Sequence, residues 1–217
     1  MKNALSLAVK ILDDSVAWQT HNFADLVVPK GDDRVKLCAG CYSIAIEFQA
    51  SILTLLKNNQ FALCFASQRL IFEALIRGLW LQYSADEKEL EAFINGRGQN
   101  KLKFMTTAIS AALGGDVLGL DELRIRIEGY LHDFTHTGIH HVSRRYTDQT
   151  LGPNYSVHDM CRIVHLTYQM GMQAAMQLFL VCGRNDLREQ ALERLVEYGK
   201  AYAELRSRHP ELTGRIP

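Results

Sequence analysis

The sequence has little proline and no excess of either charge. Only 4 of its 217 residues are proline, and 24 lysines and arginines balance 24 aspartates and glutamates. Scarce proline with 47% hydrophobic residues is typical of a helical globular protein rather than a disordered chain. The zero net charge excludes a global attraction to nucleic acid or to an anionic membrane, so any such attraction must be local.

Long apolar runs and a paired cysteine pattern are also missing. No run reaches the roughly 18 uninterrupted apolar residues of a membrane span, and Asp13 and Asp14 interrupt the short apolar start before a signal-peptide core could form. The five cysteines are odd in number, and Cys38 and Cys41 have no second pair that would suggest a zinc site. We therefore expect a cytoplasmic protein without a membrane segment, whose cysteines serve as packing residues.

The common catalytic motifs are absent as well. The sequence contains no nucleophile-elbow serine, no phosphate-binding glycine loop, no dinucleotide fingerprint and no paired zinc motif. These absences disfavour the common enzyme classes, and no cofactor is expected.

Helical periodicity is what the sequence does contain. Apolar residues recur at spacings of three and four, and breaker clusters separate the segments. The pattern predicts a single all-α domain over residues 1–217, a bundle of about eight helices with a loose tail at 211–217 and a dimer contact through one apolar helix face. The expected helices cover about residues 4–23, 34–58, 60–84, 86–95, 103–113, 121–137, 156–182 and 185–209.

Two of these helices are apolar around most of their circumference but carry one narrow polar face. Such a helix is expected to be enclosed on most sides, so that its polar face borders a cleft. Alternatively, the polar faces are solvated strips stabilised by helical ion pairs. The residues on these faces are Arg69, Glu73 and Arg77 in the third helix and His158, Arg162 and His165 in the helix that begins near residue 156.

The chain concentrates its histidines in one short stretch, residues 129–146, with the sequence GYLHDFTHTGIHHVSRRY. This stretch holds four of the eight histidines, two adjacent arginines and a glycine turn. His132 and His136 are four residues apart, so both lie on one side of the predicted helix, opposite its apolar face. We expect them to face the same cleft as the two polar helix faces.

An arginine-rich cleft with histidines favours binding of a phosphate-bearing ligand such as a nucleotide or RNA. Guanidinium groups bind phosphate through paired hydrogen bonds, and histidine exchanges protons near neutral pH. In this interpretation Arg69, Arg77 and Arg162 contact the anion and Glu73 holds the arginines in place. His132 and His136 are the proton-transfer groups of a hydrolysis reaction.

Two other functions fit the same residues. One is a metal-dependent hydrolase in which His132, His136 and Glu73 bind the ion, although the glutamate of an HExxH motif is absent. The other is a non-catalytic homodimeric interaction module, in which the polar faces are ion-paired struts.

Two segments carry a resemblance to known proteins: SQRLIFEALIRGLWL at residues 67–81 and YLHDFTHTGIHHVSRR at residues 130–145. They resemble bacterial all-helical families of unknown function that pair an arginine and glutamate helix with a later His-Thr-Gly turn. These families are distantly similar to the HEPN group (higher eukaryotes and prokaryotes nucleotide-binding), helical bundles that often dimerise and include ribonucleases. The resemblance implies a helical fold and a bacterial cytoplasmic protein.

The HEPN resemblance would also imply a cleavage motif of an arginine followed by four to six residues and a histidine. Only Arg126 and His132 could supply it in this chain. Six helical positions place these two residues about 120 degrees apart, and Arg126 lacks the polar neighbour of that motif. We therefore do not assign Arg126 as catalytic.

Overall fold

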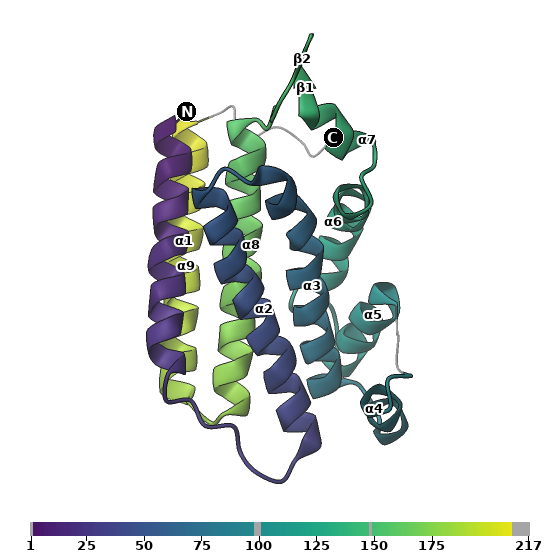
Figure 1. The fold of residues 1–217 in the computed structure, drawn as a ribbon. Helices are drawn as coiled ribbons and strands as arrows, with labels where there is room; N and C mark the ends of the chain where they lie inside the picture. The colour runs from purple at the N-terminus through teal and green to yellow at the C-terminus, as the bar shows by residue number, and fades with distance from the viewer. Residues whose placement is uncertain (1, 98–100, 148, 210–217) are drawn as a thin grey trace.

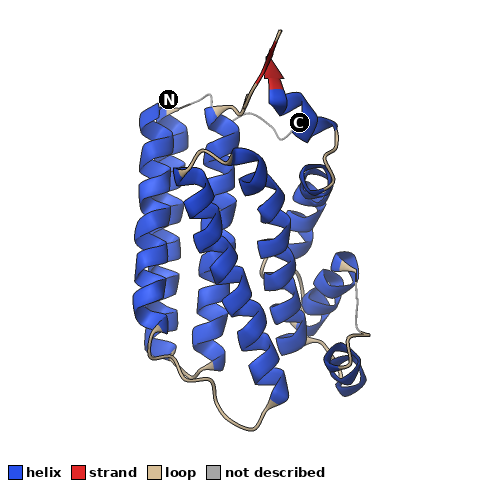
Figure 2. Cartoon of the chain, viewed as in Figure 1, coloured by secondary structure: helices blue, strands red, loops and turns tan. Residues whose placement is uncertain are grey.

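The computed structural model describes residues 2–97, 101–147 and 149–209, and nine α-helices cover most of this part of the chain (Figure 1). The all-α prediction is confirmed, because the described residues outside the helices form one antiparallel pair of two-residue strands and otherwise lack regular strand structure. Figure 2 shows that helix dominates the structure. The expected tail at 211–217 lies outside the described residues. The helices are α1 (Lys2–Phe23), α2 (Asp33–Lys57), α3 (Phe61–Tyr83), α4 (Glu87–Ile94), α5 (Leu102–Ala112), α6 (Leu120–Thr135), α7 (Ile139–Val142), α8 (Val157–Val181) and α9 (Asn185–Arg208).

The long helices α1, α2, α3, α8 and α9 run along the long axis of the molecule, with α4, α5 and α6 on the outer side of α3 (Figure 1). Helix α8 is central, because it contacts α1, α2, α3 and α9. Helix α6 packs against α3 and α5. Most of the surface of α8 is therefore enclosed by other helices, whereas one face of α6 is exposed.

The core is built from large side chains with almost no exposure, including Tyr42 of α2 and Trp80 of α3. A few polar side chains are enclosed with them. Gln68 of α3 donates a hydrogen bond from Nε2 to Thr167 Oγ1 of α8, at 2.7 Å. Gln49 of α2 is also fully buried, against α8.

Residues 139–155, which lie between two predicted helices, contain a further helix, α7, and more regular structure after it. A 3-10 helix, η1 (Ser143–Arg145), leads into an antiparallel pair of two-residue strands, β1 (Tyr146–Thr147) and β2 (Thr150–Leu151). Each of these elements has only two to four residues, which is too short to show a helical or a strand repeat of apolar residues. Apolar periodicity therefore could not reveal them.

The start of α6, predicted near residue 121, is capped by an upstream side chain, that of Asp116. Asp116 accepts hydrogen bonds from the backbone N–H groups of Leu120, Asp121 and Glu122, at 2.7, 3.1 and 3.1 Å. Burial alone would raise the pKa of Asp116, but these backbone hydrogen bonds outweigh it and lower that pKa. The carboxylate reaches the helix from four residues upstream because Gly119 adopts φ +62°.

Helix α2 is long and apolar enough to cross a membrane by length and composition, with a mean hydropathy of 1.4 over its most apolar window. The core helix of a soluble protein passes the same test. Here α2 packs against α1, α3 and α8. The absence of a membrane segment stays a prediction.

Candidate functional site

Helices α3 and α6 bring Arg69 and His132 into contact. Arg69 donates from Nε to Glu73 Oε1 at 2.7 Å, one turn along α3. Its Nη1 lies 3.1 Å from Nδ1 of His132 on α6. Glu73 therefore orients the guanidinium toward the histidine.

The contact with Arg69 fixes the tautomer of His132. A guanidinium has only donors, so Nδ1 of His132 must be the acceptor in this hydrogen bond. The proton of the neutral imidazole is then on Nε2. The ring of His136 lies beside that of His132, with the centroids 4.4 Å apart and the planes tilted by 48°. Both histidines are exposed, so the pair is open to a ligand.

The turn that follows α6 fixes the backbone next to this histidine pair. Gly138 donates its N–H to the carbonyl oxygen of Asp133 at 2.7 Å, which closes the end of the helix. Thr137 between them adopts φ +57°, a conformation that a β-branched residue rarely takes. Residues held in such conformations occur often at functional sites. The strain lies directly beside His136.

Arg77, another arginine of the predicted cleft, lies elsewhere on α3. Its Cζ is 5.6 Å from the centroid of the Phe93 ring on α4. Arg77 is half-buried and is two turns away from Arg69. It therefore contacts a different helix from the one that carries the histidines.

The polar residues of α8 form a second cluster, away from Arg69. Arg162 places its Cζ 5.4 Å from the Tyr130 ring centroid, and its Nη1 is buried without a hydrogen-bond partner among the described residues. His165 stacks on Tyr202 of α9 at 3.8 Å and 6°. His158 is half-buried one turn before Arg162.

The environment of His165 keeps its imidazole neutral. Burial, together with the charges of Arg206 and Arg126, lowers its pKa from 6.5 to about 4. Its Nδ1 lies 3.3 Å from the hydroxyl of Tyr198. His165 is therefore a packing residue of the interface between α8 and α9, in a region of positive potential.

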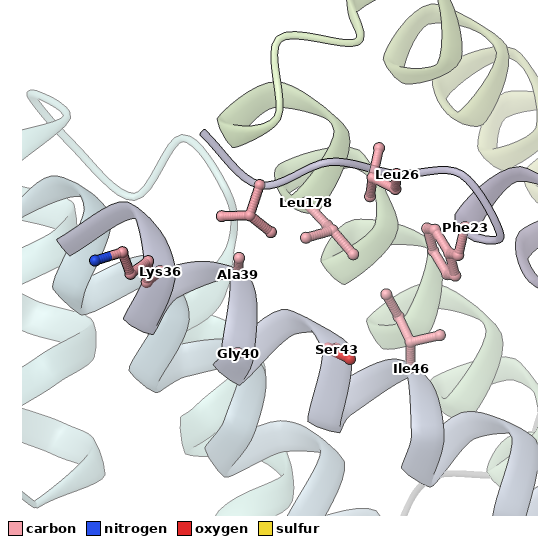
Figure 3. A pocket seen from close by; sticks show the side chains of 9 residues that line it. Phe23, Leu26, Lys36, Ala39, Gly40, Ser43, Ile46 and Leu178 are labelled. Carbon is pink, nitrogen blue, oxygen red and sulfur yellow. The ribbon is translucent and has the colours of Figure 1, made fainter. Parts of the chain in front are cut away.

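The eight predicted residues are thus divided among three places. Arg69, Glu73, His132 and His136 meet at the α3–α6 surface, and Arg77 lies over α4. His158, Arg162 and His165 lie along α8. A cavity of about 400 Å³ lies elsewhere, between α2, α8 and the segment that follows α1, and is lined mostly by apolar residues (Figure 3).

The geometry gives little support to the metal alternative. No group of three or more histidine, cysteine, aspartate or glutamate side chains that could hold a metal ion occurs within residues 2–97, 101–147 and 149–209. Glu73 is bonded to Arg69 instead of joining the two histidines.

Sequence reasoning missed the ion pair that anchors the histidine-rich stretch to α8. Arg144 lies 3.2 Å from Asp159 Oδ2 through both Nε and Nη2, and it donates from Nη1 to the carbonyl oxygen of His140 at 2.8 Å. The side chains of Arg144 and Asp159 are only 13% and 11% exposed. The signal available in the sequence was Asp159, an acidic residue in the first turn of an otherwise largely apolar helix.

The model of a family of unknown function, DUF6988, matches residues 42–204. The chain belongs to this family. No curated protein and no solved structure gave a significant match. The matched residues of the DUF6988 family include all three places described above, and the HEPN-like kinship stays a prediction.

Proposed function

We propose that the protein binds a phosphate-bearing ligand, such as a nucleotide or RNA, at the surface formed by Arg69, Glu73, His132 and His136, and that the histidine pair transfers protons during its hydrolysis. The single observation that carries this proposal is the 3.1 Å contact between Arg69 Nη1 and His132 Nδ1, beside the exposed ring of His136.

Arg69 suits the role of the anion contact. Its Nε is bonded to Glu73, so the planar guanidinium is held in one orientation and loses little entropy when a ligand binds. Its side chain is 25% exposed. A phosphate oxygen can therefore reach the Nη groups and form a charge-assisted hydrogen bond.

The histidine pair suits acid and base catalysis without a metal. When a phosphate oxygen takes the hydrogen bond of Arg69 Nη1, Nδ1 of His132 is free to bind a proton. The resulting imidazolium can donate its Nε2 proton to the leaving oxygen as the phosphorus–oxygen bond breaks, and the ring returns to the neutral form. His136 accepts the proton of the attacking hydroxyl or water. Arg69 stabilises the charge that develops on the phosphoryl oxygens.

Isothermal titration calorimetry with a nucleoside monophosphate and a nucleoside triphosphate tests the binding. Arg69→Ala is expected to weaken binding at least tenfold, which corresponds to about 1.4 kcal/mol. His132→Ala is expected to keep the fold, since the ring is exposed, and to remove hydrolysis. Arg184→Ala, which removes an exposed ion pair with Asp186, is the matched control. Equal affinity in Arg69→Ala and Arg184→Ala would refute the proposal.

A homodimeric interaction module is the second candidate, and one observation favours it. Four large apolar side chains of the segment after α6 are exposed, Leu151 by 88%. Exposed apolar residues gathered in one region often mark a protein interface. The other three are Ile139, Val142 and Tyr146. A dimer in light scattering that dissociates in Leu151→Lys would support this module, and a monomeric wild type would refute it.

A further inference from the structure

The exposed face of α6 connects the two clusters that the predicted site residues form. Successive exposed positions on this helix follow the three- and four-residue spacing of one face. His132 lies on the edge of this face next to α3, where it meets Arg69. Arg126 lies about 120 degrees around the helix, on the opposite edge. The exposed residues are Glu122, Ile125, Arg126, Gly129, His132 and His136.

Three arginines from three helices lie on the side of α6 that carries Arg126. Arg126 is one turn before Tyr130 on α6, and Arg162 of α8 places its Cζ over the Tyr130 ring. Arg206 is one turn after Tyr202 on α9, and Tyr202 stacks on His165 of α8. In agreement with this placement, the charges of Arg126 and Arg206 both lower the pKa of His165. The two charged groups that affect His165 are both arginines. Within the part of the chain that the structure describes, Arg126 forms an ion pair with Glu122 at the long distance of 3.8 Å, and both side chains are exposed. Such a pair contributes little and leaves Arg126 able to bind an anion.

Arg162 adds a buried donor to this group. Its Nη1 has no hydrogen-bond partner among the described residues, and an unpaired buried donor is costly. Its guanidinium is fixed over the Tyr130 ring. A ligand oxygen that reached Nη1 would satisfy the group.

Gly129 lies between the two clusters and has no structural reason to be glycine. It is in the middle of α6, where glycine destabilises a helix relative to alanine. A Cβ atom at this position would meet nothing within 4 Å. Gly40 and Gly199 are equally open in their helices, but only Gly129 lies between Arg126 and His132. The missing side chain leaves the backbone open to close approach by a ligand.

We infer that a single-stranded oligonucleotide crosses α6 at Gly129, with one phosphate at Arg69 and His132 and another at the group of Arg126, Arg162 and Arg206. This inference rests on the proposed function, because it extends the same phosphate site. Arg126 and His132 are six residues apart, or about 9 Å along the helix axis. One phosphate group does not span this distance, whereas a chain of several nucleotides does.

The test compares a nucleoside monophosphate with a fluorescent single-stranded oligonucleotide of about ten nucleotides, a length that exceeds the span between the two clusters. The oligonucleotide is expected to bind at least tenfold more tightly, with a steeper salt dependence, because each added phosphate contact adds about 0.7 to the slope of log K against log salt concentration. Arg206→Ala is expected to reduce that slope by about 0.7. Arg184→Ala, which lies outside both clusters, is expected to change neither the slope nor monophosphate binding.

Two variants of equal size at Gly129 isolate the crossing point. Gly129→Glu is expected to weaken oligonucleotide binding about tenfold, and Gly129→Gln by only a few fold, because the carboxylate repels phosphate. Both replace glycine by a better helix former, so loss of folding does not account for a loss of affinity.

The outcomes separate the two proposals. If the monophosphate binds through Arg69 but the oligonucleotide binds no more tightly, or Gly129→Glu binds it as wild type does, the inference is wrong and the proposed function stands. If neither ligand binds, both are wrong.

Discussion

The side chain of Asp133 occupies the space that a Cβ atom at Gly138 would need. An ideal Cβ built on Gly138 lies 1.8 Å from Asp133 Oδ1 and 2.4 Å from its Cγ, far inside contact distance. The backbone N–H of His140 donates to Asp133 Oδ2 at 2.7 Å and holds the carboxylate there. Gly138 is therefore required by this carboxylate, since its φ of −73° suits any residue.

Gly138→Ala is expected to lower the free energy of unfolding by about 1–3 kcal/mol, because the displaced carboxylate leaves the N–H of His140 without its acceptor. Urea denaturation measures this change. Gly152→Ala in the same segment meets nothing within 4 Å and is expected to change stability by less than about 0.5 kcal/mol. Similar losses in both variants would contradict the steric explanation.

The difference in exposure between two ion pairs predicts losses of stability of different size when their acidic residues are removed. Glu73 is 34% exposed beside Arg69, so Glu73→Ala is expected to cost less than about 1 kcal/mol. Asp159 is 11% exposed, and Asp159→Ala leaves Arg144 enclosed without its partner, at a cost of about 3–5 kcal/mol. Thermal and urea unfolding of both variants provides the comparison. An equal loss of stability in Glu73→Ala and Asp159→Ala would show that the exposure of an ion pair does not determine the cost of removing its acidic residue.

Periodicity predicted the long helices because each of them buries one or more faces against neighbours. The pattern of α3 and α8 therefore reported their extent to within a few residues. It could not predict which neighbour each polar face would meet, since that depends on packing. Arg69 and His132 meet because α6 lies against α3. His165, on a similar polar face, meets Tyr202 of α9 instead.

Short-range chemistry accounts for the other differences from the sequence predictions. Asp116 caps α6 across a glycine with positive φ, and this depends on a backbone conformation that the sequence pattern does not reveal. Helix α7 spans only Ile139–Val142 and is too short for an apolar repeat. In the sequence, Gln49 cannot be told apart from an exposed polar residue, because its burial depends on the close approach of α8 at Gly171.

The close pair of Gln49 and Gly171 predicts non-additive mutations. A Cβ atom at Gly171 would lie 2.0 Å from Gln49 Oε1, so Gly171→Ala is expected to destabilise the protein by about 1–3 kcal/mol through overpacking. In the background of Gln49→Ala, which removes the obstructing amide, the same change is expected to cost at least about 1 kcal/mol less. A double-mutant cycle by urea denaturation measures this coupling. If the changes in the free energy of unfolding caused by the two substitutions are additive, the side chain of Gln49 is not what a Cβ atom at Gly171 would clash with.

His165 predicts a loss of stability as the pH falls. Its pKa is about 4 in the folded protein, against an ordinary value of 6.5, because burial disfavours the charged ring and Arg206 and Arg126 add to the effect. The unfolded chain therefore binds a proton in the window from pH 6.5 down to pH 4 that the folded protein does not, so stability falls with pH across this window and is fully present above it. The contribution lost near pH 5 is about 2 kcal/mol. His165→Phe keeps an aromatic ring on Tyr202 but cannot titrate, so its free energy of unfolding is expected to fall less than that of the wild type when both are measured by urea denaturation at neutral pH and near pH 5. The other histidines are the same in both proteins, so parallel pH profiles would mean that His165 is already accessible to protons in the folded state.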